Sequence, residues 1–239
     1  MNIIGVIPAR WASTRFKGKV LADIAGKPMI QHVYERVLKS SLLSDVIIAC
    51  DDDKVLEVCN GFGAKVVMTR IDHPSGSDRI AEVVKDLDVD VVINVQGDEP
   101  LIDAQVIDDL ARVFKKDAEC SMATVIKAID EIEDLNNPNV VKVVTDCNGY
   151  ALYFSRSMIP YNRESIQRTS FKHLGIYAYR KDFLMTYITM PVSGLEEAEC
   201  LEQLRVLEAG YRIKTVITEM KTLGVDTPED LEKVKQVIG

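Results

Sequence analysis

The segment from Pro8 to Lys19 combines the residue types that bind phosphate groups. It holds cations, hydroxyls and a glycine in one short stretch: Arg10, Ser13, Thr14, Arg15, Lys17, Gly18 and Lys19. Arginine grips phosphate oxygens with two parallel N–H groups, lysine supplies a compact charge, and glycine lets backbone N–H groups approach closely. A solvated cationic loop is the alternative reading of the charges. The pattern favours a cradle for a polyphosphate.

The position of this loop supports the phosphate interpretation. It follows the apolar run 2–7, which predicts a buried parallel strand. The loop therefore leaves the sheet at a carboxyl strand end, where open α/β sheets bind their ligands.

A second chemical signal is the acidic sequence 96–100, Gln-Gly-Asp-Glu-Pro, directly after an apolar run that ends at Val95. Carboxylates at such a strand end suit Mg²⁺, which takes a few carboxylates together with substrate phosphate oxygens. Asp98 is the expected ligand, and the alternative is that Asp98 caps the helix after Pro100. A Walker A motif is absent, and Gly61-Phe62-Gly63 lacks the third glycine of a dinucleotide-binding fingerprint.

Strands and helices alternate through the first half of the chain. Expected strands are 46–50, 64–68 and 91–95, and expected helices are 28–40, a segment after Asp53, and 77–86. The first helix has an apolar face made of Met29, Ile30, Val33, Val37 and Leu38. This rhythm predicts an α/β fold with a doubly wound, mostly parallel sheet.

The second half predicts an antiparallel insertion in that fold. Runs 140–144 and 150–154 flank a turn at 146–149 and read as a hairpin. A strand at 173–179 and a last strand at 212–218 are expected, with helices at 195–209 and 227–238. No linker or repeat divides the chain, so residues 1–239 are expected to form a single domain.

The net charge and the cysteine content limit the classes of binding partner and the cellular compartments that we expect for this protein. The 37 acidic residues outnumber the 29 basic ones, giving a net charge of −8, which argues against nucleic-acid and anionic-membrane binding. The expected partner of the basic loop is therefore a small anion. The five cysteines lie far apart without a C-x-x-C pair, so reduced thiols are expected. Without a leader or a long apolar run, the expected location is the cytoplasm.

A set of motifs in order along the chain resembles the 3-deoxy-manno-octulosonate cytidylyltransferase (CMP-Kdo synthetase) family. The matching segments are 7–19, 26–30, 69–70 with His73, 75–79, 95–100, 151–156, 173–177, 201–205 and 224–230. The resemblance runs from Ile4 to Val237. It implies the reaction CTP + Kdo → CMP-Kdo + pyrophosphate with Mg²⁺, in lipopolysaccharide biosynthesis, and a nucleotidyltransferase fold.

The resemblance implies roles for the nucleotide-binding residues. Those residues are Pro8, Ala9, Arg10, Ser13, Thr14, Arg15, Lys19, Arg70, Ser75, Gly76 and Arg79. Lys19, Arg15 and Asp98 are expected to be catalytic, because fixed cations stabilise charge on the leaving pyrophosphate. Lys17 departs from the family, which usually has proline there. Ser75 and Asp78 also predict a helix start.

The same resemblance implies a metal site and a sugar pocket. Asp98 and Asp226 match the metal carboxylates, although Asp226 alone would also read as an N-cap of the helix at Pro228. The residues that match the Kdo pocket are Gln96, Arg156, His173, Tyr177, Glu202 and Gln203. Arg156 is the expected partner of the Kdo carboxylate. Taken individually, Glu202 also reads as helix surface and His173 as an ordinary strand residue.

Two other functions remain open at this stage. One is a cytidylyltransferase for a related acidic sugar, such as 8-amino-Kdo or a sialic acid. The other is a catalytically silent nucleotide-binding protein, against which the intact Lys19, Asp98 and Arg156 argue. The family resemblance further implies a homodimer built around the segment after the hairpin, where residues 157–161 carry apolar surface that would equally suit core packing.

Overall fold

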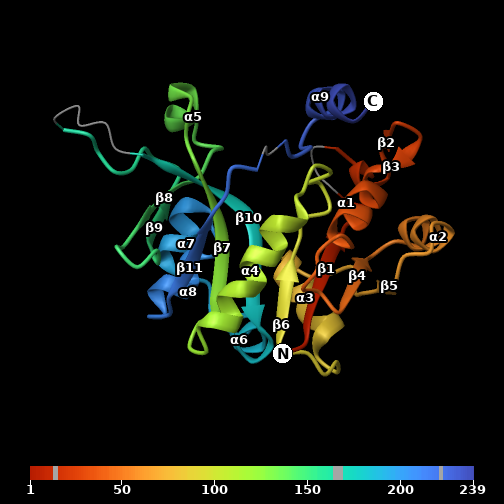
Figure 1. Cartoon of the computed structure of the whole chain (residues 1–239), viewed down its shortest axis with the longest axis horizontal. Helices are drawn as coiled ribbons and strands as arrows, with labels where there is room; N and C mark the ends of the chain where they lie inside the picture. Colours follow the sequence, from red (N-terminus) through yellow and green to blue (C-terminus); the bar gives the residue numbers. More distant parts are fainter. Residues whose placement is uncertain (13–15, 164–168, 221–222) are drawn as a thin grey trace.

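The computed structural model describes residues 1–12, 16–163, 169–220 and 223–239. A nine-stranded sheet runs through the molecule in the order β11-β7-β10-β6-β1-β4-β5, and β8 and β9 extend it beside β10 (Figure 1). The predicted residues Ser13, Thr14 and Arg15 lie outside the described residues.

The parallel part of the sheet is centred on β1 (Ile3–Ala9), every residue of which is buried. It pairs in parallel with β4 (Asp45–Cys50) on one side and β6 (Val91–Asn94) on the other, and β5 (Val66–Met68) continues from β4. Both faces of these strands are covered, which explains why their sequences are continuously apolar. The expected mostly parallel sheet is confirmed.

An antiparallel strand interrupts this order. The long strand β10 (Phe171–Arg180) lies between β6 and β7 (Met122–Ala128) and runs antiparallel to both. Strand β11 (Ile213–Ile217) then pairs in parallel with β7. The sequence predictions omitted β7, whose ends lack the glycine and proline residues that usually mark strand boundaries.

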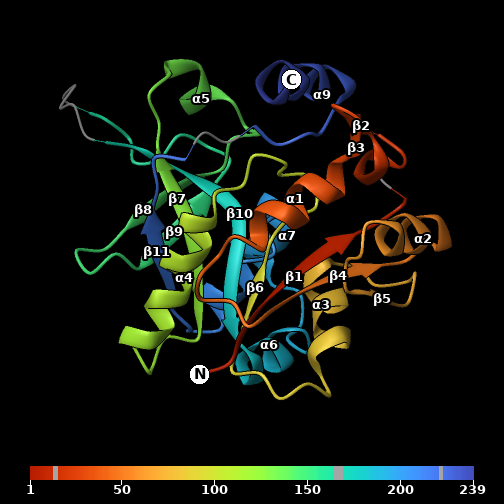
Figure 2. The same ribbon diagram turned by 45° about the vertical axis from the view of Figure 1, so that its right-hand side comes forward.

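Helices cover both faces of the sheet (Figure 2). Ile3 and Ile7 of β1 belong to one buried cluster together with residues of α1 (Met29–Val37) and α4 (Ala104–Lys116). Ile4 and Val6 belong to the opposite cluster, with α3 (Gly76–Val84) and α6 (Lys181–Tyr187). Successive side chains of β1 point to opposite faces of the sheet and pack into two separate cores. This is the doubly wound arrangement predicted.

The remaining elements are short or peripheral. They are η1 (Lys19–Leu21), β2 (Asp23–Ile24), β3 (Lys27–Pro28), α2 (Asp53–Gly61), α5 (Ile132–Asn136) and α9 (Pro228–Ile238). Helix α9 packs on β2 through Leu231 and Val234, and Val225, just ahead of the helix, joins the same buried cluster with Ile24. The chain's last helix is thereby held near the loop that follows β1.

The predicted hairpin is present as β8 (Lys142–Thr145) and β9 (Ala151–Ser155), which pair antiparallel. Its turn is closed by Asp146, whose backbone N–H donates to the Tyr150 carbonyl at 2.8 Å. All five cysteines are free, and Cys147 and Cys200 are exposed whereas the other three are buried. Within the described residues, every helix is too short or too polar to cross a membrane.

Two helix predictions need correction. The helix predicted at 195–209 is two helices, α7 (Gly194–Glu199) and α8 (Leu204–Glu208), because Cys200 adopts a left-handed conformation with φ 51°. The helix predicted at 28–40 ends at Val37, and Leu38 is 52% exposed instead of joining the apolar face. Periodicity alone predicts helix faces better than it predicts where helices end.

Candidate functional site

A pocket of about 470 Å³ lies where β1 and β6 end. It is lined by Pro8, Arg10, Ala12, Lys19, Val20, Pro74, Ser75, Gly76, Asn94, Gln96, Gly97, Asp98 and Glu202. The structure therefore brings together eight of the predicted site residues: Pro8, Arg10, Lys19, Ser75, Gly76, Gln96, Asp98 and Glu202. The carboxyl ends of neighbouring parallel strands meet at this edge, as expected.

Lys19 connects the basic loop to the acidic loop. Its Nζ lies 2.5 Å from Asp98 Oδ2 and 3.3 Å from Asp226 Oδ1, and it donates to the Val225 carbonyl at 3.1 Å. The Lys19 side chain is only 13% exposed, so the ammonium is screened by water less than a surface lysine would be. One cationic atom thus contacts both carboxylates that were predicted to hold a metal.

The loop between β1 and η1 is closed by its backbone. The Gly18 N–H donates to the Trp11 carbonyl at 3.0 Å, and Gly18 has φ 71°. A side-chain carbon added at Gly18 would lie 2.8 Å from the Trp11 ring, so glycine is required by both conformation and space. The Trp11 N–H in turn donates to Asp51 Oδ1 at 2.8 Å. Asp51, at the end of β4, is a positioning residue that the sequence analysis missed.

The two alternative capping roles are wrong. Helix α4 is capped by Asp103, whose side chain accepts from the Gln105 N–H, and so Asp98 does not cap it. Helix α9 is capped by Thr227 in a reciprocal arrangement with Asp230, and so Asp226 is not its N-cap. The Asp98 and Asp226 carboxylates are left facing the Lys19 ammonium.

The donor set fits Mg²⁺. The Asp98 and Asp226 carboxylates both face the position of the Lys19 ammonium. Mg²⁺ prefers one or two carboxylates supplemented by phosphate oxygens and water. Within the described part of the chain, no group of three or more His, Cys, Asp or Glu side chains is placed to hold a metal.

Glu99 is a second carboxyl beside this cluster that the sequence analysis did not select. Burial, reinforced by the neighbouring Asp98 and Asp226 charges, raises the pKa of Glu99 to about 7. A side-chain carbon at Gly224 would lie 2.9 Å from Glu99 Oε1, so the 224–226 segment packs directly against the acidic loop. The Val225 N–H also donates to the Asp98 carbonyl at 2.9 Å, which joins the two segments.

The start of α3 forms another wall of the pocket. Ser75 caps the helix by accepting from the Asp78 N–H, which confirms the predicted helix start. Gly76 packs against the Pro8 ring, with a separation of 3.6 Å for an added side-chain carbon. The amino end of a helix attracts anions through its unpaired N–H groups and its dipole. This wall therefore suits the negative charge of a nucleotide.

The pocket wall that contains Glu202 carries amide and carboxyl groups, unlike the wall formed by the start of α3. Ser77 Oγ donates to Glu202 Oε1 at 3.2 Å, and burial raises the pKa of Glu202 above its ordinary value. Gln96 Nε2 lies 3.2 Å from both Asn94 Oδ1 and the Gly175 carbonyl. Amide and carboxyl groups at this end can exchange hydrogen bonds with sugar hydroxyls.

An aromatic row lies behind this end of the pocket. His173 and Tyr177 have ring centroids 5.2 Å apart, and Tyr177 stacks on Tyr179 at 5.9 Å. His173 Nε2 hydrogen bonds with Thr124 Oγ1 at 2.9 Å. Burial lowers the pKa of His173 to about 3, so its imidazole is neutral near pH 7. Thr124, on the strand β7 that was not predicted, is a further positioning residue.

Several predicted site residues do not line the pocket in this structure. The buried Arg79 donates to Asp51 Oδ2 at 2.8 Å and to Thr69 Oγ1 at 2.5 Å. Arg70 pairs with Asp72 on the surface. The others that lie outside the pocket lining are Ala9, Arg156, His173, Tyr177, Gln203 and Asp226. Of these, Asp226 still contacts the pocket residue Lys19. Their assignments to substrate stay predictions.

Arg156 makes an unexpected set of contacts. Its guanidinium donates to three carbonyls, those of Glu199 at 2.7 Å, Pro138 at 2.9 Å and Cys200 at 3.3 Å. The left-handed Cys200, which breaks the predicted helix, supplies one of these carbonyls. Arg156 thus ties the hairpin to the α7–α8 junction just ahead of Glu202.

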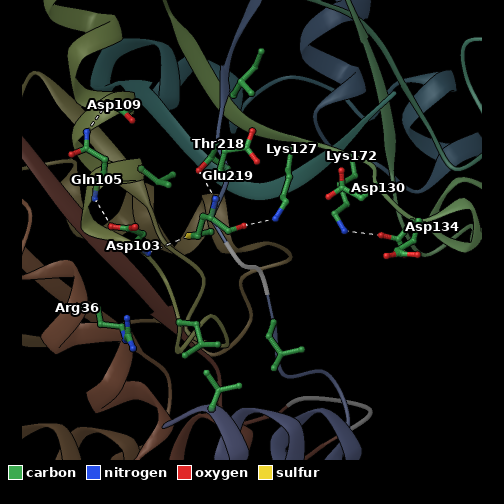
Figure 3. A pocket seen from close by; sticks show the side chains of 17 residues that line it. Arg36, Asp103, Gln105, Asp109, Lys127, Asp130, Asp134, Lys172, Thr218 and Glu219 are labelled. Atoms are coloured by element: carbon green, nitrogen blue, oxygen red, sulfur yellow. Dashed lines mark hydrogen bonds and ion pairs between the residues drawn. The ribbon is translucent and has the colours of Figure 1, made fainter. Parts of the chain in front are cut away.

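A second, larger cavity of about 1020 Å³ lies among α4, β7, β11 and α5 (Figure 3). Its lysines already have protein partners, since Lys172 pairs with Asp134 at 2.7 Å and Lys127 donates to the Met220 carbonyl at 2.9 Å. Acidic side chains such as Asp130 and Glu219 also line it. The cavity is therefore less suited to a polyphosphate than the pocket around Lys19.

Comparisons with known proteins agree with this geometry. The cytidylyltransferase family profile matches residues 4–216. The chain is 51% identical over 245 residues to the 3-deoxy-manno-octulosonate cytidylyltransferase of Geobacter sulfurreducens, covering 98% of both chains. It is 52% identical over 237 residues to the enzyme of the same name from Solibacter usitatus, covering 99% of this chain and 94% of the relative. It is also similar to a solved CMP:2-keto-3-deoxy-manno-octonic acid synthetase complexed with CTP, with a TM-score of 0.96, 46% identity, and coverage of 99% and 98%.

Proposed function

This chain belongs to the cytidylyltransferase family and, within it, to the 3-deoxy-manno-octulosonate cytidylyltransferases, and we propose that it transfers CMP from CTP to the anomeric hydroxyl of Kdo. The products are CMP-Kdo and pyrophosphate. The observation that carries this proposal is the contact of Lys19, in the pocket at the end of β1 and β6, with the pocket residue Asp98 and with Asp226 beside the pocket.

The reaction is an in-line displacement at the α-phosphorus. The anomeric hydroxyl of Kdo attacks and releases its proton to water, and pyrophosphate leaves from the opposite side with the electrons of the broken P–O bond. Arg10 and Lys19 hold the triphosphate and stabilise the charge that grows on the leaving group. Catalysis of such a transfer requires correct positioning of the two substrates and neutralisation of the phosphate charge, so no covalent enzyme intermediate is needed.

Asp98 and Asp226 would hold Mg²⁺ between the two substrates. The ion, when bound, neutralises phosphate charge and lowers the pKa of a hydroxyl that it contacts. Lys19 would donate to the phosphates, whose oxygens compete with the Asp98 and Asp226 carboxylates for this ammonium. Asp98 and Asp226 would thereby help to orient the α-phosphate and the anomeric hydroxyl of Kdo.

The sugar is proposed to occupy the Gln96 and Glu202 end of the pocket. Its hydroxyls would exchange hydrogen bonds with Gln96, Glu202 and Gln203, and the neutral His173 would support Tyr177 beside them. Gln203 Nε2 is buried, lies outside the pocket lining, and lacks a hydrogen-bond partner within the described residues, so a side-chain movement would be needed before it could bind a substrate oxygen. Arg156 is proposed to meet the Kdo carboxylate.

The hairpin side of the molecule is the proposed dimer interface. Tyr161 is 79% exposed and Met158 is 41% exposed, both in the segment after β9. Leu152 on β9 is 61% exposed, which adds apolar surface to the same region. A homodimer would cover these side chains. A monomer mass by light scattering at micromolar concentration would contradict this interface.

The reaction places the protein in lipopolysaccharide biosynthesis, where CMP-Kdo is the activated sugar. The proposed location is the cytoplasm, and the five free thiols are compatible with a reducing compartment. CTP and Kdo are the proposed small-molecule substrates.

Measurement of pyrophosphate release tests the substrate assignment. CTP is supplied with Kdo, 8-amino-Kdo or a sialic acid, each in the presence of Mg²⁺. The highest kcat/KM is expected with Kdo. A preference for 8-amino-Kdo would reassign the sugar within the same reaction class, whereas no release with any sugar would contradict nucleotidyl transfer.

A further inference from the structure

Arg156 is held on both sides of its backbone by charged side chains. Its N–H donates to Glu199 Oε2 at 2.9 Å. Its carbonyl accepts from Lys142 Nζ at 2.5 Å, and Lys142 has no exposed surface. Hydrogen bonds to charged groups are stronger than those between neutral groups. The backbone at residue 156 is therefore fixed by two such bonds.

Glu199 also controls the side-chain surroundings of Arg156. Its carboxylate accepts from Ser155 Oγ at 2.6 Å, and its backbone carbonyl accepts from Arg156 Nε at 2.7 Å. Burial works to raise the pKa of Glu199, but the hydrogen bonds from Ser155 and Arg156 outweigh it and lower that pKa. Glu199 is thus ionised at neutral pH and binds three groups on two consecutive residues of the hairpin end.

The same residue lies at the break that leads to the pocket wall. Glu199 ends α7, and Cys200 follows in the left-handed conformation that separates α7 from α8. Cys200 is therefore one residue from Glu199, and the Glu202 carboxyl that lines the pocket is three residues from it. A shift of Glu199 would move Arg156 on one side and Glu202 on the other.

We propose that Glu199 is a positioning residue for the acidic sugar substrate, holding Arg156 and the Cys200 turn so that the sugar end of the pocket keeps its shape. The proposal rests on the proposed function, because the sugar whose binding it affects is the acceptor of CMP. Glu199 acts through Arg156 and Glu202 and does not line the pocket itself. The Glu199 carboxylate accepts from Ser155 and Arg156, which lie apart from the Lys19 and Ser75 side chains of the nucleotide end.

The variant Glu199→Gln tests the proposal, because an amide keeps the shape but offers only one acceptor oxygen to donors that need two. We expect the KM for Kdo to rise about tenfold, the effect of losing a charge-assisted hydrogen bond, with the KM for CTP within about twofold of wild type. The matched control is Glu197→Gln, which removes the same charge from an exposed position of α7 and should leave both constants unchanged.

The outcomes separate the two proposals. Wild-type protein that fails to form CMP-Kdo would contradict the proposed function. A normal wild type together with an unchanged KM for Kdo in Glu199→Gln would overturn the positioning role, as would equal changes in both KM values. Should this variant fail to fold, Ser155→Ala removes one donor to the same carboxylate, and it must raise the KM for Kdo about threefold without affecting CTP.

Discussion

The Nζ atom of Lys19 lies 2.5 Å from Oδ2 of Asp98, although 79 positions separate the two residues in sequence. This contact joins the loop after β1 to the loop after β6, which are neighbours because β1 and β6 pair in parallel. Arg10 and Lys19, the cations proposed to bind phosphate, and Asp98, the proposed metal ligand, consequently line one pocket.

Asp98→Asn should lose about 10²-fold or more in kcat while keeping the fold. The amide has nearly the same shape but lacks the charge, and removal of one well-placed electrostatic group costs this much. Steady-state kinetics at saturating Mg²⁺, together with a melting curve, provide the measurement. Asp86→Asn is the control, since the Asp86 side chain is 87% exposed just beyond the carboxyl end of α3. A near-normal kcat would remove Asp98 from the site.

Lys19→Ala should impair catalysis far more than Lys17→Ala. Lys19 is largely covered and contacts both carboxylates, whereas Lys17 is exposed. Measuring kcat/KM for CTP in both variants distinguishes the two lysines. Equal losses would mean that the phosphate contacts are assigned to the wrong lysine.

Asp226→Asn and Thr227→Ala should have opposite effects. Thr227 caps α9, so its loss should lower the free energy of unfolding by about 1 kcal/mol and leave turnover unchanged. Asp226 faces Lys19, so Asp226→Asn should lower turnover at nearly unchanged stability. Chemical denaturation and kinetics on both variants provide the comparison, and an unchanged kcat in Asp226→Asn would rule out its proposed metal role.

Arg156→Ala should lower kcat/KM for Kdo by at least tenfold, because loss of one member of a desolvated charge pair costs about 2–5 kcal/mol. CTP binding measured by calorimetry without sugar should change little. Stability should also fall, since three carbonyls lose the guanidinium. A collapse of CTP affinity with normal Kdo dependence would move Arg156 to the nucleotide end.

His173 should make the protein less stable in mild acid. Its folded pKa of about 3 lies below the unfolded value of about 6.5, so the unfolded chain binds more protons between these values. The free energy of unfolding should therefore decrease as the pH falls below about 6.5. His173→Gln should show a smaller decrease, measured by urea denaturation at several pH values. Parallel pH profiles for both proteins would show that His173 does not titrate differently on folding.

The sequence predicted the nucleotide end of the site better than the sugar end. Arg10, Lys19 and Asp98 follow buried parallel strands directly, so strand order alone brings them to one edge. Arg156 contacts the carbonyl of Cys200, two residues before Glu202, where the chain adopts a left-handed conformation that no glycine marks in the sequence. A helix interrupted by a non-glycine residue is invisible to hydrophobic periodicity.

Long-range side-chain contacts were also beyond sequence reasoning. Asp51 reads as an ordinary polar residue after a strand, yet it fixes Trp11 and Arg79. Glu199 and Lys142 likewise gain their roles from the pairing of the hairpin with the α7–α8 junction. Such partners depend on tertiary packing, which residue type and spacing do not specify.

The most direct test of the central claim is phosphorus NMR of the wild-type protein mixed with CTP, Kdo and Mg²⁺. Transfer of CMP predicts that the three CTP signals decay while pyrophosphate and one new phosphodiester signal appear in equal amounts, and that neither appears without Kdo. Unchanged CTP signals, or conversion of CTP to CDP and inorganic phosphate, would contradict it.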